Sequence, residues 1–164
     1  MPRPVGALVA LVSAVALLAM PAPAQTNEGH AAAKQQAQQA AASWLALVDN
    51  DEFEAGWDAA ASLLQKRIKR ETWVQKARRL RDTVQALSTR TLEMTQFRAS
   101  LQRASDGGPF VLLKYRSTFE GGRFEELLLT VRQDTTWKVT GYQVTPLRPP
   151  IGGRAASPPD SSGR

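Results

Sequence analysis

Carboxylates are the only side chains in this sequence that are well placed for acid–base chemistry. The chain has a single histidine, His30, and no cysteine. Histidine is the usual acid–base group near neutral pH, and zinc and copper sites draw mainly on histidine and cysteine. His30 precedes the predicted folded region, so catalytic triads and transition-metal chemistry are not expected in that region. We predict no metal site and no cofactor.

Three carboxylates remain as candidates, namely Asp58 and the neighbours Glu125 and Glu126 in a predicted strand. Consecutive strand residues point to opposite faces of a sheet, so one of the two glutamates is expected to face the helices. A buried carboxylate there could act as an acid or a base. It could instead form an ion pair with Arg90 or Arg116 on a neighbouring strand, and we favour this structural role.

The sheet that would position these glutamates is predicted mainly by residues 110–144. Apolar and polar residues alternate as in half-buried strands, and Gly121-Gly122 and residues 133–136 have the composition of hairpin turns. The predicted strands are residues 88–101, 110–119, 124–132 and 137–144. The segment around Gly107-Gly108 is expected to be a loop between the first two.

Three helices are predicted before the sheet, over residues 31–49, 51–68 and 71–87. The first is rich in strong helix formers and lacks Gly and Pro. In the second, Phe53, Trp57, Ala60 and Leu64 recur at spacings of three and four and form one apolar face. Helices followed by antiparallel strands predict an α+β domain, with about three N-terminal helices on one face of a curved four-stranded antiparallel sheet.

Aromatic side chains are more numerous than a minimal core of this size requires. We expect most of them to lie in the core, and some to line a ligand pocket between the sheet and the helices. The candidate pocket residues are Trp57, Trp73, Tyr115, Phe119, Trp137 and Tyr142.

A basic run lies between Lys66 and Asp82, where eight Lys and Arg residues stand against two acidic residues. Such a run is usually a solvated face, and the alternative is contact with an anionic partner. The whole chain has a formal net charge of +6 at pH 7. In an exported protein this charge points to anionic envelope polymer or lipid, and we expect no nucleic-acid partner.

The N-terminal segment, residues 1–24, has the features of a secretory signal peptide, with Arg3, an apolar run and a predicted cleavage after Ala24. The apolar run is shorter than the roughly 20 residues that span a membrane, so no stable anchor is expected after cleavage. We expect a periplasmic or secreted protein with a polar leader at 25–30, a domain at 31–144 and a disordered Pro/Gly/Ser-rich tail at 145–164.

Four short motifs resemble a family of exported bacterial proteins, the domain of unknown function family 4019. They are residues 44–49 (WLALVD), 56–58 (GWD), 70–74 (RETWV) and 137–142 (WKVTGY). The resemblance covers about residues 41–144 and implies a small α+β domain similar to the nuclear transport factor 2 or cystatin type. It implies no activity and no catalytic residues. One departure is Lys69, which stands where relatives tend to have a small capping residue.

Three functions are compatible with these features. The first is a non-enzymatic module that binds a small apolar ligand or a protein. The second is a small enzyme that uses a buried Asp or Glu, which requires Asp58, Glu125 or Glu126 to face a closed pocket without a basic partner. The third is an electrostatic adaptor that uses the basic run. The sequence predicts neither the identity of the ligand nor the oligomeric state.

Overall fold

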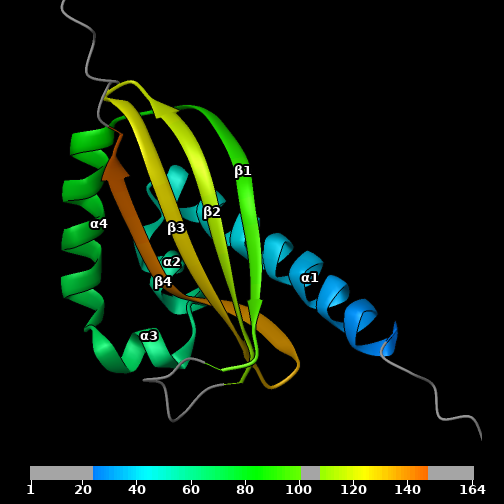
Figure 1. Cartoon of the computed structure of the whole chain (residues 1–164). Helices are drawn as coiled ribbons and strands as arrows, with labels where there is room; N and C mark the ends of the chain where they lie inside the picture. Colours follow the sequence, from blue (N-terminus) through cyan, green and yellow to red (C-terminus); the bar gives the residue numbers. More distant parts are fainter. Residues whose placement is uncertain (1–23, 101–107, 148–164) are drawn as a thin grey trace, which may run out of the picture.

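The computed structural model describes residues 24–100 and 108–147 of the chain (Figure 1). It contains four helices, α1 (Ala24–Asp49), α2 (Phe53–Ala59), α3 (Ser62–Arg67) and α4 (Arg70–Val84). Four strands follow, β1 (Leu87–Arg98), β2 (Phe110–Phe119), β3 (Gly122–Gln133) and β4 (Thr136–Pro146). The predicted α+β class and the four-stranded antiparallel sheet are confirmed.

The sheet is open, and its strands pair in sequence order, β1-β2-β3-β4, each antiparallel to the next. Strand β2 has the predicted bounds, and the other three differ by one to three residues at either end. Tight turns join the last three strands, and Gly122 (φ 132°) and Asp134 (φ 55°) adopt positive φ there. Bulges interrupt the β1–β2 register between Leu92 and Met94 and the β3–β4 register between Leu129 and Thr130.

The helices differ more from the prediction. The single helix expected over residues 51–68 is divided, because Ala60 and Ala61 have extended backbone (ψ 165° and 147°) between α2 and α3. The Ala61 N–H donates to the carbonyl of Val139 at 2.8 Å, so a contact with β4 replaces a helical hydrogen bond. Helix α4 ends three residues earlier than expected, because Gln85 has a φ of 64°.

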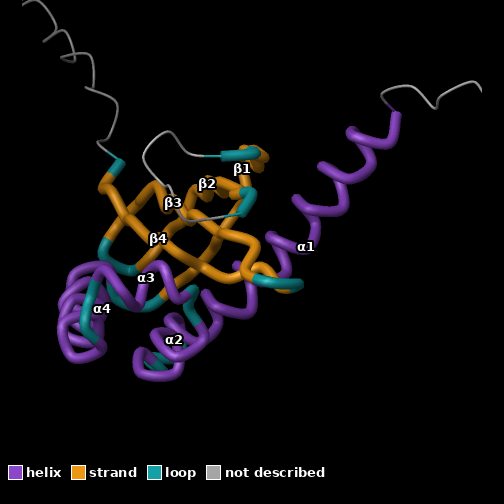
Figure 2. The backbone as a smooth tube through the Cα atoms, turned by 90° about the horizontal axis from the view of Figure 1, so that it is seen from below, coloured by secondary structure: helices purple, strands orange, loops and turns teal. Residues whose placement is uncertain are grey.

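The expected polar leader, residues 25–30, lies within α1, which begins at Ala24. Figure 1 shows α1 crossing behind the sheet and extending past β1. In Figure 2, α2, α4 and the C-terminal part of α1 lie on the same side of the strands. Lys69 is the N-cap of α4 and makes no capping hydrogen bond with its side chain, as the departure at this position predicts.

The main core lies between the sheet and the helices. Strand β2 contributes Val111, Leu113 and Tyr115, and α1 contributes Trp44 and Leu45, all of which are buried. A smaller cluster on the other face of the sheet joins Phe110, Val131 and Ala61, so the chain between α2 and α3 also covers one end of that face. The sheet therefore has one face well covered by helices, which is where a site between the two layers can form.

Residues 1–23 of the predicted signal peptide and most of the predicted tail lie outside the described residues, and so do residues 101–107 of the expected loop. Strand β4 continues to Pro146, two residues beyond the end expected at Val144. Among the described residues, no helix combines the length and the apolar character needed to cross a membrane.

Candidate functional site

A cleft of about 300 Å³ lies between β4 and the helix pair α3–α4. Its wall is mostly apolar and carries two cationic residues. The lining residues are Val48, Leu64, Arg67, Ile68, Trp73, Lys76, Ala77, Leu80, Gly141 and Tyr142. Ligand pockets in proteins are typically about 300–1,000 Å³ and predominantly apolar, so this cleft is at the lower end of that range.

The turn between α3 and α4 forms one end of the cleft. Ile68 has extended backbone (φ −139°, ψ 134°) and ends α3, and the N–H of Ile68 donates to the carbonyl of Leu64 at 3.1 Å. The Trp57 indole N–H donates to the carbonyl of Ile68 at 3.3 Å. Trp57 from α2 therefore supports the turn from behind without lining the cleft.

Trp73 and Tyr142 form the aromatic part of the cleft wall. The Trp44 ring packs against both, with ring centroids 5.6 Å from Trp73 and 5.3 Å from Tyr142. The indole N–H of Trp73 donates to the carbonyl of Phe53 at 3.1 Å, and that of Trp44 donates to the carbonyl of Gly56 at 2.7 Å. These buried hydrogen bonds hold the rings in place, so the wall is formed before any ligand binds.

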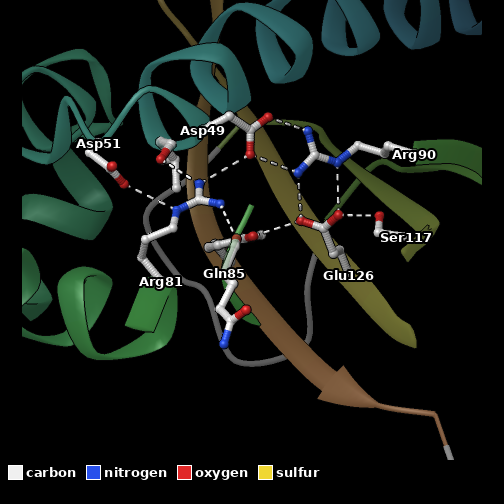
Figure 3. A network of polar contacts seen from close by, with 9 residues as sticks. Asp49, Asp51, Arg81, Gln85, Arg90, Ser117 and Glu126 are labelled. Carbon is white, nitrogen blue, oxygen red and sulfur yellow. Dashed lines mark hydrogen bonds and ion pairs between the residues drawn. The ribbon is translucent and has the colours of Figure 1, made fainter. Parts of the chain in front are cut away.

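An ion network is buried beside the cleft, and Glu126 lies at its centre (Figure 3). The Glu126 side chain is fully buried. Arg90 donates to it from Nε at 2.7 Å and from Nη2 at 3.1 Å, and the Ser117 hydroxyl donates a further, short hydrogen bond. The Tyr142 hydroxyl donates to Glu126 Oε2 at 2.6 Å. Four donors thus satisfy a carboxylate that would otherwise be costly to bury.

Arg90 connects the sheet to the end of α1. Its Nη1 and Nη2 donate to the two carboxylate oxygens of Asp49, at 2.5 and 3.1 Å. Burial alone would lower the pKa of Arg90, but its hydrogen bonds to Asp49 and Glu126 outweigh burial and raise the pKa above its ordinary value. The guanidinium is therefore permanently charged and bridges two carboxylates.

Arg81 extends the network from Asp49 to two tight turns (Figure 3). It donates to the carbonyl of Val48 at 2.7 Å and to Asp49 Oδ1 at 3.3 Å. It also donates to the carbonyl of Gln85 at 2.9 Å, and its Nε lies 3.1 Å from Asp51 Oδ1 without the alignment of a hydrogen bond. Asp51 and Gln85 both have positive φ, near 60°, so Arg81 stabilises two conformations that non-glycine residues rarely adopt.

Tyr142 belongs to both the cleft and the ion network. Its ring lines the cleft, whereas its hydroxyl points to Glu126. Burial raises the pKa of Tyr142 well above 10.0, the negative charge and hydrogen bond of Glu126 raise it further, and Arg90 opposes the shift. A second, small space of about 10 Å³ shares Tyr142 with the cleft and is also lined by Phe119 and Arg81. The network thus fixes one wall of the cleft.

The predicted pocket residues are distributed over several places. Trp73 and Tyr142 line the cleft, and Phe119 lines the small second space. Trp137 lines a separate groove of about 500 Å³ between α1, α2 and β4. Tyr115 is buried in the main core, and Trp57 packs against that core from outside it. Neither Tyr115 nor Trp57 is among the residues that line these three cavities.

The three candidate carboxylates each have a basic partner. Asp58 pairs with Arg70 at 3.1 Å at the surface, and Glu125 pairs with Lys114 at 2.6 Å at a partly exposed site. Glu126 is the glutamate that faces the helices, and it pairs with Arg90, one of the two partners predicted for it. Arg116, the other, pairs with Glu93. The condition for an acid–base site, a carboxylate without a basic partner, is not met by any of the three.

The sequence did not predict several residues of the cleft and of the ion network. Asp49 was placed only at the end of a predicted helix and of one short motif, and its contact with Arg90 spans 41 positions of sequence. Arg67 and Lys76 were included in the basic run, but no local pattern separates them from their basic neighbours.

The single histidine, His30, stacks on Phe97 with ring centroids 4.1 Å apart. In the part of the chain that the structure describes, no group of acidic, His and Cys side chains could hold a metal ion.

Comparison with known proteins identifies a family but assigns no activity. Residues 40–142 match the model of a family described as protein of unknown function (DUF4019). This range includes the cleft and the central residues of the ion network. A search of the curated proteins finds no match.

Proposed function

Because the chain belongs to the DUF4019 family, whose description names no activity, we propose a function from the geometry: a non-enzymatic domain that binds a small, largely apolar ligand in the cleft between β4, α3 and α4. The observation that supports this proposal most directly is the cleft itself. It combines about 300 Å³ of space with a mostly apolar wall that includes Trp73 and Tyr142. These are the features by which small-molecule sites are usually recognised.

The rigidity of the wall is a second argument for ligand binding. Trp73 is held by a hydrogen bond to Phe53, and Tyr142 is held by a hydrogen bond to Glu126. Ordering flexible side chains on binding costs about 0.5–1.5 kcal/mol for each rotamer-rich side chain. A wall that is already ordered avoids much of this cost, so a small cleft can bind with useful affinity.

Binding of the neutral dye Nile red tests the proposal. We expect saturable binding to the wild-type chain, with increased dye fluorescence. In Ala77→Leu, the added carbons project from a buried position on the cleft wall, and we expect the affinity to fall by about tenfold, equivalent to about 1.4 kcal/mol. Fluorescence titration gives the dissociation constants, and circular dichroism reports whether each variant is folded.

Ala59→Leu is the matched control, because exposed Ala59 lines the separate groove beside Trp137. Its affinity for the dye should equal that of the wild type. Leu64→Ala is a second cleft variant at a half-buried position, and loss of its apolar contact should weaken binding several-fold even if Ala77→Leu folds poorly. An absence of dye binding to the wild type, or equal affinity in all four proteins, would overturn the proposal.

We also propose that the protein is exported and acts in the periplasm or outside the cell. The support is the signal-like composition of residues 1–24. Expression with the native N-terminus should yield a mature chain that begins at Gln25, because cleavage is predicted after Ala24. Intact-mass measurement of the periplasmic and cytoplasmic fractions checks this, and a full-length protein found only in the cytoplasm would contradict it.

The likeness to the nuclear transport factor 2 or cystatin type of fold stays a prediction. What supports it is one long helix, α1, that contacts every strand of an open, twisted antiparallel sheet. Fold analogy alone does not assign a ligand, so the binding proposal depends on the cleft.

A further inference from the structure

We propose that the ligand of the cleft is an amphiphile with an anionic head group, a single alkyl chain bearing a carboxylate or a phosphate, and that Arg67 and Lys76 hold the head group. This inference rests on the proposed function and adds to it the chemical class of the ligand. Arg67 ends α3 and Lys76 lies in the second turn of α4, so they approach the cleft from two different helices.

The charges around the cleft favour an anionic ligand. Among the described residues, Arg67 and Lys76 are the only charged ones that line it, and no described carboxylate does. Elsewhere in the basic run, Arg70 pairs with Asp58, Arg78 with Glu54, and Arg81 with Asp49 and Asp51. Within residues 24–100 and 108–147, no such ion pair involves Arg67 or Lys76. Two cations without carboxylate partners at one apolar cleft favour an anionic guest.

The hydrogen-bond donors of the aromatic wall are already used within the protein. The Tyr142 hydroxyl donates a hydrogen bond to Glu126, and the Trp73 indole N–H donates one to the carbonyl of Phe53. Both donors of the aromatic wall are therefore already used inside the protein. A ligand's polar group would lose its hydrogen bonds with water at this end and find no free side-chain donor there, which is unfavourable. The apolar end of the ligand is thus expected to lie against Tyr142 and Trp73.

The two cations are more exposed than the apolar residues of the cleft. Arg67 and Lys76 are exposed, whereas Ala77 and Trp73 are buried. The cleft therefore changes from a cationic, solvated mouth to an apolar interior, which matches an alkyl chain with an ionised head. A guanidinium and an ammonium both form charge-assisted hydrogen bonds with carboxylate or phosphate oxygens, and the guanidinium can do so with two parallel bonds.

Decanoate, decyl phosphate and decanol provide a matched test, because the three share one alkyl chain and differ in the head group. Isothermal titration calorimetry at low salt should show both anions binding about tenfold more tightly than decanol. The Arg67→Gln/Lys76→Gln double variant should lower the affinity for the anions to that for decanol, and should leave the affinity for decanol unchanged. Added salt should weaken the anions and leave decanol unaffected, since the two cations are exposed.

Lys66→Gln/Lys69→Gln is the control double variant, because it removes two exposed charges of the same basic run that do not line the cleft. It should keep the preference for the anions. If decanol and the anions bind the wild type equally, or if both double variants lower the anion affinity to the same extent, the head-group site is overturned while the apolar cleft stands. If none of the three compounds binds, the proposed function itself fails. A preference for one anion over the other would identify which head group the two cations fit.

Discussion

Replacing Glu126 with alanine is expected to lower the free energy of unfolding by about 3–5 kcal/mol, the usual cost of removing one partner from a buried ion pair. The Glu126 side chain is fully buried and accepts hydrogen bonds from Arg90, Ser117 and Tyr142. Without it, Arg90 keeps Asp49 as its only carboxylate partner, and two buried hydroxyls lose their acceptor. The loss would remove a large part of the 5–15 kcal/mol that stabilises a typical domain.

Urea unfolding followed by circular dichroism measures this change, and Glu125→Ala is the matched control. Glu125 is the adjacent residue of β3, points to the other face, and pairs with Lys114 at a partly exposed site. Its removal should cost no more than about 1 kcal/mol. If Glu126→Ala is too unstable to purify, Glu126→Gln keeps the shape of the side chain and should still be clearly less stable than Glu125→Gln. Equal losses at the two positions would show that the ion network does not stabilise the fold.

Stability should also fall steeply above pH 10, with Tyr142 as a main cause. The pKa of Tyr142 is raised well above 10.0 by burial and by Glu126, so the folded protein keeps the phenol protonated where the unfolded chain has lost the proton. The stabilisation from this group is therefore complete below pH 10 and is lost as the pH rises towards the folded pKa. Each pH unit in this window should cost about 1.4 kcal/mol.

Comparison with Tyr142→Phe isolates this contribution, because phenylalanine has no proton to lose. The variant is expected to be less stable at neutral pH, since Glu126 loses one donor, but its stability should decline less steeply above pH 10. The protein has only two tyrosines, and burial raises the pKa of Tyr115 as well. Phenolate absorbance should therefore appear mainly with unfolding. Equal slopes in the wild type and the variant, or phenolate formation in the folded protein near pH 10, would contradict the assignment.

The helices show where local sequence patterns succeed and where they fail. Strong helix formers and regular apolar spacing predicted helical structure around α1, α2 and α4. The pattern of residues 51–68 continued through Ala60 and Ala61, two residues that favour helix, so a single helix was expected. The break occurs because Ala61 donates its backbone N–H to Val139 in β4. The local pattern of residues 51–68 contains no information about a contact with a residue so distant in sequence.

The acidic residues show the same limit for the site. Alternation along β3 predicted that one of Glu125 and Glu126 would face the helices, because strand residues alternate between faces whatever their partners are. The choice of Glu126, and its pairing with Arg90, depends on how β1 registers with β2 and β2 with β3. The contribution of Asp49 could not be predicted, since it comes from the end of a helix that meets the sheet only in the folded chain.

Taken by itself, the sequence determined the α+β class, the four antiparallel strands and the family, because alternation, turn residues and short motifs each involve only a few neighbouring positions. Only the tertiary structure decided which aromatics line a cleft and which fill the core. Trp57 and Trp73 look alike in sequence, yet Trp73 lines the cleft and Trp57 supports it from behind. The physical reason is that a cleft is the space left between elements after packing, so it depends on contacts such as those of α3 with β4 and of α2 with α4.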